Sequence, residues 1–268
     1  RDYMARGLVL LRELDSGYVT FDIEYVDESP QAVDGRYLRQ QLPAIIESEF
    51  AFVEAQIRAL FGALAAGQIP LSDAEDFVDQ LAGLTVEIRE DLKAAAAGVV
   101  QDNDAFLGQA ARFHGEAYFT INILSNESAV QDDLSAEIAH VELTNLETTE
   151  NASLRRGEDL SPAIERILLG ARGAGFPNVV VDPDGVRRRI DLLAEVEGDY
   201  FGQLVIRPLL DWLGGPQVRA EGNRVVLTDA TIPGSQEPTQ ISIPLATDGR
   251  MLINWPKAEY EESFRHAT

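Results

Sequence analysis

Apolar residues at two different spacings divide the first part of the chain into helices and strands. From Met4 to Leu14 they recur every three or four positions, which predicts an amphipathic helix with one buried face. In YVTFDIEYV (18–26), β-branched and aromatic residues alternate with others, which predicts a strand. The same order returns as DAFLGQAARF followed by AYFTINIL (117–124), so we expect the two strands to be parallel neighbours in an α/β sheet.

Two long stretches of helical periodicity interrupt this alternating pattern. Apolar residues step by three or four through residues 43–64 and again through 77–92. Between them, Ser72 followed three positions later by Glu75 is a capping-box arrangement, which starts a new helix. The pattern predicts a helical hairpin, residues 43–100, inserted into the α/β domain, with arms of roughly 20 residues.

The second half of the chain is rich in strand-like segments. Residues 126–159 are acidic and weakly patterned, and we expect a mobile connection there. A helix is predicted from Ser161, with Pro162 at its first helical position, and another over YFGQLVIRPLLDWLG (200–214). The fold class that follows is α/β, a mixed sheet flanked by helices, with a long helical-hairpin insertion.

The stretch VVVDPDGVRRRIDLL contains a P-D-G turn at residues 183–185, between two strand-like runs. It does not fit a calcium loop, because glycine comes immediately after the second aspartate. Beyond the turn, Arg188 shares a strand face with Ile190 and Leu192. We therefore expect Arg188 near the core side, paired with Asp22 or with a carbonyl group of the turn.

Several of these segments, taken in order, resemble one known family. PNVVVDPDGVRRRIDLL, YFGQLVIRPLLDWLG and QISIPLATDGRMLINW are similar to the second class of CHASE domains, which are extracytoplasmic sensors of cyclases and histidine kinases. RDYMARGLVLLREL, YVTFDIEYVDESP and DNDAFLGQAARF resemble the family's N-terminal half, in which an arginine opens the first helix and an aspartate lies in the next strand.

The resemblance implies a non-catalytic sensory domain, residues 1–268, outside the cytoplasmic membrane of a bacterial receptor. It further implies that a ligand or partner controls a cytoplasmic adenylate or guanylate cyclase, and so cAMP signalling, with a histidine kinase as the alternative output. Class III cyclases work as dimers, so a homodimer is implied. The family pattern includes a strand before the arginine-led helix, and a strand and transmembrane helices after INW. We therefore expect the domain to be incomplete at both ends and anchored in the membrane through segments outside this chain.

Composition removes several classes of function. Forty-five acidic residues against 22 Lys and Arg give a net charge of −23, and such a surface repels nucleic acids and anionic lipids. Cysteine is absent, so disulfide and thiol chemistry are excluded. No phosphate-binding loop, dinucleotide fingerprint or zinc motif occurs, and we expect no cofactor and no metal in this chain.

Four residues are candidates for ligand binding. Asp22 and Glu24 share one face of the predicted strand 18–26, and Asn122 lies near the carboxyl end of the second strand, where ligands of open α/β sheets bind. Arg188 is the fourth. Paired carboxylates also do acid and base work, so a periplasmic metal-dependent hydrolase using Asp22 and Glu24 stays open. The preferred interpretation is structural, with Asp22 paired to a buried arginine such as Arg188 or to one of the turn amides.

The histidines offer less. Glu137 and His140 form a lone E-x-x-H, which a di-iron bundle would need twice, so a solvated acidic helix is the preferred interpretation. His114 is expected at a helix C-terminus, where an imidazolium interacts favourably with the helix dipole.

The hairpin raises a third hypothesis, a protein-interaction module. Phe61, Leu64 and Phe77 are expected to complete the seam between the arms, which leaves Ile69 and Leu71 at the tip without packing partners. The hairpin would then bind a second copy or another periplasmic protein, unless it folds back onto the sheet. If the sensed partner is not a protein, we expect an unknown small molecule to bind to the sheet domain instead.

Overall fold

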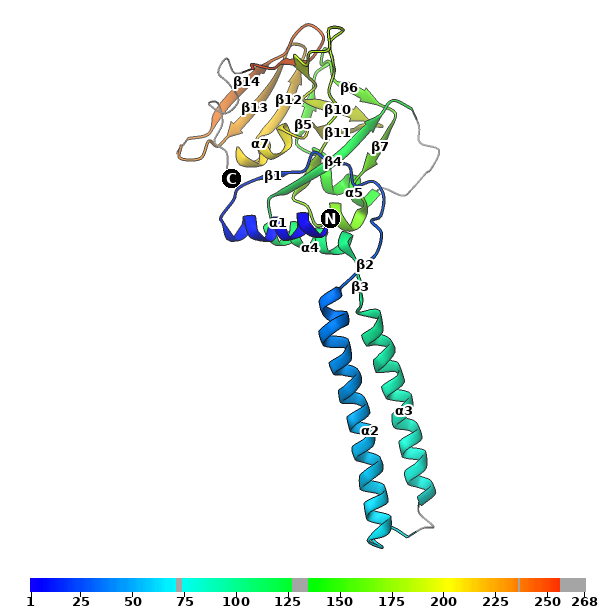
Figure 1. Ribbon diagram of the computed structural model, residues 1–268. Coiled ribbons are helices and arrows are strands. Elements are labelled where there is room, and N and C mark those ends of the chain that lie inside the picture. Colours follow the sequence, from blue (N-terminus) through cyan, green and yellow to red (C-terminus); the bar gives the residue numbers. More distant parts are fainter. Residues whose placement is uncertain (71–73, 127–134, 236, 256–268) are drawn as a thin grey trace. The chain divides into compact units, whose positions relative to one another are not determined.

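The computed structural model describes residues 1–70, 74–126, 135–235 and 237–255. It has two compact units: a sheet unit, residues 1–28 and 104–268, and a hairpin unit, residues 29–103. Mixed sheets flanked by helices and a pair of long helices make up these units (Figure 1), so the predicted α/β class is confirmed.

The first layer of the sheet unit is built around one long strand. Its helices and strands are α1 (Asp2–Glu13), β1 (Val19–Thr20), α4 (Asn103–His114), β4 (Ala117–Leu124), β7 (Asp159–Pro162), α6 (Glu165–Leu168) and β8 (Gly173–Gly175). In the centre, β4 pairs in parallel with β1 and β8 and antiparallel with β7. The expected parallel neighbours, β1 and β4, are therefore confirmed.

Helices α1 and α4 lie side by side against this layer (Figure 1). The α1 helix is confirmed, but the face that it buries centres on Ala5 and Leu8, while Leu14 is exposed. Helix α4 approaches α6 so closely that a Cβ at Gly108 would lie 2.0 Å from the carbonyl oxygen of Arg166. Only glycine fits at this contact.

A second hydrophobic cluster fills the remainder of the sheet unit, where β13 pairs antiparallel with both β12 and β14. The remaining helices and strands of the sheet unit are α5 (Ser135–Val141), β5 (Leu146–Thr148), β6 (Arg155–Gly157), β9 (Arg189–Ile190), β10 (Leu193–Val196), β11 (Asp199–Gly202), α7 (Ile206–Trp212), β12 (Gln217–Glu221), β13 (Arg224–Ala230), β14 (Thr239–Pro244) and β15 (Met251–Leu252). Of these, α5, β10 and β11 contribute buried residues to the first cluster.

Three predictions for this half were wrong. The segment 126–159 is not a plain connection, because β5 pairs with β12 and β6 pairs with β10, while residues 127–134 lie outside the described ones. Ser161 and Pro162 end strand β7 instead of starting a helix, since β4 offers them a free edge. The helix expected over 200–214 begins only at Ile206, because the residues before it pair with β10.

The hairpin unit contains the two long helices that the periodicity predicts. Helix α2 (Leu42–Ala65) follows a short π-helix, η1 (Tyr37–Gln41), and α3 (Ala74–Ala97) returns. At the base, β2 (Ala32–Val33) pairs antiparallel with β3 (Val100–Gln101). The predicted capping box lies outside the described residues at Ser72, and Glu75 is described only in its backbone. None of the helices in the described ranges is both long and apolar enough for a membrane span.

Candidate functional site

The predicted carboxylate pair does not lie on a strand. Strand β1 ends at Thr20, and Asp22 and Glu24 are exposed on irregular backbone. The physical reason is competition for the edge of β4. Phe21 N–H reaches the carbonyl of Tyr118 (2.9 Å), but two residues further along that edge the carbonyl of Thr120 accepts from Ala163, just after β7. The shared strand face that the hydrolase hypothesis required is therefore absent.

Asn122 is half-buried in β4, opposite Ser161 of β7, so an antiparallel strand covers the strand end where we expected a ligand. No hydrogen bond or ion pair in the described ranges joins any two of Asp22, Glu24, Asn122 and Arg188. The structure does not link these four candidates into one site.

Arg188 is exposed, and its partners are the aspartates of its own turn. Its guanidinium donates to both carboxylate oxygens of Asp184 (2.8 and 2.7 Å) and to Asp182 (3.2 Å). The bonds from Arg188 to Asp184, with that from Val186 N–H, lower the pKa of Asp184 to about 2. The expectation that Arg188 sits near the core and pairs with Asp22 was wrong, because two carboxylates are available within six residues.

The P-D-G segment is the turn that the sequence predicts. Gly185 has a positive φ of 82°, and Asp182 N–H donates to the carbonyl of Val186 (3.0 Å). An antiparallel bridge between Val180 and Arg189 extends the hairpin beyond the turn.

The buried charge of this motif belongs to Asp191. Its side chain is only 9 % exposed, and each of its oxygens accepts from a different arginine. Oδ1 accepts from Arg250 Nε (3.1 Å) and Oδ2 accepts from Arg155 Nη1 (3.4 Å). A carboxylate this buried must be paired, and here its partners come from segments 36 and 59 residues away in sequence.

A glycine turn positions Arg250. Gly249 has a positive φ of 80°, and Ala246 N–H donates to the carbonyl of Arg250 (2.7 Å). The preceding residue, Asp248, accepts from Arg189 (3.2 Å). These contacts join the D-G-R motif near the C-terminus to the R-R-R-I-D motif.

Around this cluster lies a pocket of about 400 Å³, which we call the Asp191 pocket. Its lining residues are Ser153, Leu154, Arg155, Arg156, Val180, Asp191, Asp248 and Arg250. Sequence reasoning missed it. The available signal was a charged residue, Asp191, inside the apolar run of a predicted strand, which requires a partner.

Two other buried polar contacts hold the sheet unit together. Arg1 forms an ion pair with Asp104, which is almost completely buried, and its guanidinium also lies 5.0 Å from the ring centre of Tyr25. The hydroxyl of Tyr118 donates to Asp211 (2.6 Å), which ties β4 to α7, and burial raises the pKa of this tyrosine. Both contacts are structural in character.

His114 is the last residue of α4, as predicted, but it is fully buried and burial lowers its pKa. Its Nδ1 accepts from Glu116 N–H (3.3 Å), so the expectation of an imidazolium at this position was wrong.

Of the E-x-x-H pair, Glu137 is buried, whereas His140 places Nε2 3.0 Å from the carbonyl of Ala171. Among the described residues no cluster of three His, Cys, Asp or Glu is arranged to hold a metal.

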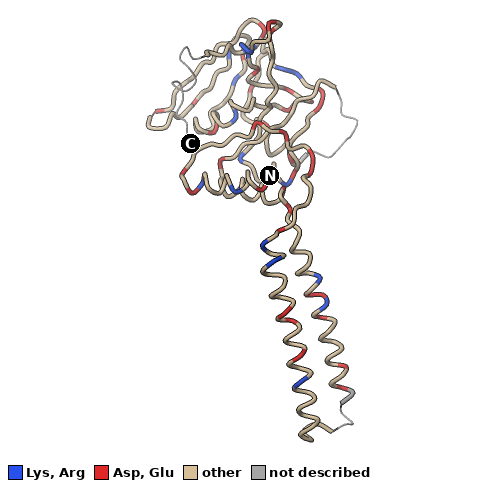
Figure 2. The backbone as a smooth tube through the Cα atoms, viewed as in Figure 1, with Lys and Arg blue, Asp and Glu red and all other residues tan. Residues whose placement is uncertain are grey.

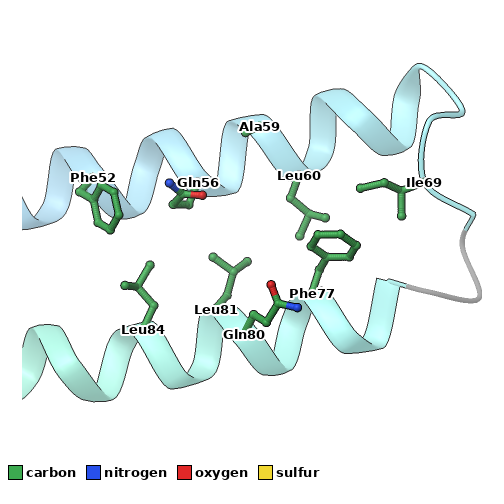
Figure 3. A pocket seen from close by; sticks show the side chains of 9 residues that line it. All are labelled: Phe52, Gln56, Ala59, Leu60, Ile69, Phe77, Gln80, Leu81 and Leu84. Atoms are coloured by element: carbon green, nitrogen blue, oxygen red, sulfur yellow. The ribbon is translucent and has the colours of Figure 1, made fainter.

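The arms of the hairpin enclose a hollow of about 490 Å³ near their tip. Figure 3 shows Leu60, Ile69 and Phe77 directed toward one another there. Ile69 therefore has packing partners, contrary to expectation, whereas Phe61 lies outside the seam and is exposed. Leu71 lies outside the described residues.

Two further hollows lie along one side of the hairpin unit, with volumes of about 460 and 530 Å³. They share Phe50 and Val53, and Phe50 is 62 % exposed. Both arms have long uncharged stretches (Figure 2). We call this side the Phe50 face.

Comparison with known families gives one match. A family model described as the CHASE2 domain matches residues 1–268. The chain belongs to the CHASE2 family. CHASE2 domains are extracytoplasmic sensor modules of signal transduction, so the predicted sensor domain is confirmed at this level. No curated protein and no solved structure matches the chain.

Proposed function

We propose that this CHASE2 domain is the sensor of a bacterial transmembrane receptor, and that its state sets the activity of a cytoplasmic adenylate or guanylate cyclase. The observation that carries the proposal is the family match along the whole of residues 1–268. In this proposal the catalytic groups belong to the cyclase, and the domain acts as its regulator. It acts by shifting the population between two arrangements of the receptor.

The active unit is a dimer, and the Phe50 face of the hairpin is its contact surface. No residue of α2 is buried, although the helix is apolar around most of its circumference. A helix of that composition is normally covered on more than one side. The second arm covers only the seam, and the hollows around Phe50 stay open.

Charge on the Phe50 face favours a second copy as the occupant. The hollow on α2 is lined by Glu47 and by the ion pair of Glu54 with Arg58, while Arg89 and Lys93 line the adjoining hollow on α3. A two-fold contact places the same face of both copies together, so acids of one arm meet bases of the partner's other arm. The face is thus self-complementary in charge as well as apolar at its centre.

Sedimentation of the purified chain across a micromolar concentration series tests the contact. We expect a dimer for the native chain and a monomer for Phe50→Asp, which puts a charge at the centre of the face. Val86→Asp is the matched control, since Val86 is 47 % exposed on α3 and lines neither hollow of the Phe50 face. A native chain that stays monomeric, or a Phe50→Asp chain that stays dimeric, contradicts the contact.

The cyclase output has its own test. Cyclic nucleotide formed by the full-length receptor, in a host without a cyclase of its own, is expected to differ between the native protein and Phe50→Asp. Absence of cyclic nucleotide would overturn the output and leave the dimer contact to be judged by sedimentation.

A further inference from the structure

We propose that the Asp191 pocket binds a small organic anion carrying a carboxylate or phosphate group, with Arg155, Arg156 and Arg250 as its ligands. The inference rests on the proposed sensor function, because it names the chemical class of the molecule that is sensed. Three properties of the pocket support it: the charge of its lining, its N–H donors, and a shape that is already fixed without a ligand.

The local charge is opposite to that of the chain. The protein carries a net charge of −23, yet the pocket is lined by three arginines and only two aspartates. Asp191 is shared by Arg155 and Arg250, and Asp248 is shared by Arg250 and Arg189. The carboxylate nearest Arg156 is Glu195, outside the lining and at 3.6 Å, so the arginines are in excess within the lining itself. Such a pocket attracts an anion locally, while the acidic surface around it repels anions. A small anion that fits inside the pocket is therefore favoured over a large polyanion.

Donor groups remain for that anion. Arg155 Nε has no hydrogen-bond acceptor in the described part of the chain, but the atom is buried, so the donors that Arg155 can offer an anion are the N–H groups of its fork that Asp191 does not use. The Arg156 side chain is 82 % exposed, and its ion pair with Glu195 spans 3.6 Å. A guanidinium has five N–H donors, so Arg250, which gives Nε to Asp191 and Nη1 to Asp248, retains further ones.

The pocket is also held in shape before any ligand enters. Asp191 fixes Arg155 on β6 and Arg250 beside β15, so two guanidinium groups from separate elements are oriented by one buried carboxylate. Planar guanidinium forks match the two oxygens of a carboxylate or phosphate. Because little ordering remains to be done, less free energy of binding is lost to entropy.

Size and lining favour an organic anion. A volume of about 400 Å³ falls in the range of small-molecule sites, roughly 300 to 1,000 Å³. Leu154 and Val180 contribute apolar surface beside the charged groups. The lining is otherwise mostly polar, so it is the volume that allows a metabolite-sized acid and not only a bare inorganic ion.

Calorimetric titration of the chain at constant ionic strength tests this. Succinate, citrate, glycerol 3-phosphate and inorganic phosphate are the probes, and sodium chloride is the reference for non-specific screening. We expect one site per chain for a carboxylate or an organic phosphate, with binding at least ten-fold weaker in Arg156→Gln. Arg156 is mostly exposed, so this variant keeps the fold; Arg250→Lys, which keeps the charge but loses the fork, is the second variant.

Arg219→Gln is the matched control, because Arg219 is a half-exposed arginine paired with Glu221 on β12 and does not line the pocket. Equal affinity in the native and Arg156→Gln chains, or heats no larger than those of chloride for every probe, would overturn the proposal. Binding by the carboxylates alone or by the phosphates alone supports it and identifies the source. Calorimetry measures binding to this chain alone. A negative result would therefore overturn the anion site without bearing on the proposed cyclase output.

Discussion

Asp191 and Arg250 are joined by a hydrogen bond of 3.1 Å, although 59 residues separate them in sequence. The bond links the strand after the P-D-G turn to the D-G-R turn near the C-terminus. Arg155, on β6, completes the cluster on the other oxygen of the same carboxylate. Three distant segments thus meet at one buried charge.

Replacing Asp191 with Asn is therefore expected to destabilise the chain. The substitution leaves two part-buried arginines without their shared carboxylate, and breaking such a pair costs about 3 kcal/mol. Urea denaturation measures the change. Glu221→Gln, which removes a surface partner of Arg219 and Arg224, is expected to cost less than about 1 kcal/mol. An equal loss in both variants contradicts a special role for Asp191.

The ion pair between Arg1 and Asp104 gives a second prediction. Asp104→Ala is expected to lower the free energy of unfolding by about 3 kcal/mol, because Arg1 is left largely buried without a carboxylate partner. Arg6→Ala removes only the exposed pair with Asp2 and is expected to cost about 0.5 kcal/mol or less. Similar unfolding curves for the two variants would show that the Arg1 charge is solvated.

Glycines in two helices are expected to respond in opposite directions to the same substitution. Gly108→Ala places a methyl group 2.0 Å from the carbonyl oxygen of Arg166 and is expected to cost at least about 2 kcal/mol. Gly7→Ala, in the middle of α1 with no atom within 4 Å of the new carbon, is expected to stabilise by about 0.5 to 1 kcal/mol. Thermal melting of both variants checks the sign, and a stabilised Gly108→Ala would be inconsistent with the close approach of α4 and α6.

The buried His114 is expected to make the free energy of unfolding depend on pH. Burial lowers the pKa of His114 in the folded chain, so below about pH 6.5 the unfolded chain binds a proton that the folded chain does not. The contribution of His114 is therefore present above about pH 6.5 and is lost as the pH falls toward the lowered pKa. His114→Asn keeps an acceptor for Glu116 N–H and removes the titration.

The measurement is urea unfolding of the native and His114→Asn chains from pH 7.5 to 5.5. The difference in unfolding free energy between them is expected to shrink as the pH falls. A difference that stays constant over this range would show that His114 titrates alike in both states.

The sequence patterns predicted the structure correctly where it is decided by neighbours along the chain. The two helices of the hairpin and the turn at Gly185 follow from periodicity and from local backbone preference, and both are present. The strand expected over 18–26 was cut short because β7 competes for the edge of β4, a choice that depends on residues more than 100 positions away.

The candidate site was harder to predict for the same reason. Arg188 was assigned to the core from its position on a strand face, but turn carboxylates close by in sequence hold it in solvent. Asp191, two strand positions from an arginine-rich run, carries the buried charge, and its partners are set by tertiary packing. Alternation placed Arg188 on the core face of this strand and gave no sign that Asp191, on the other face, would be the buried charge.

The central claim is that this extracytoplasmic domain sets the activity of a cytoplasmic nucleotide cyclase through its paired hairpins. The most direct measurement is the rate of cAMP and cGMP formation by the full-length receptor in a cyclase-deficient bacterium, compared among the native protein, Phe50→Asp and Val86→Asp at equal expression. The account predicts cyclic nucleotide from the native receptor, a rate changed several-fold by Phe50→Asp, and a native rate for Val86→Asp. No cyclic nucleotide from the native receptor, or the same rate in all three, would contradict it.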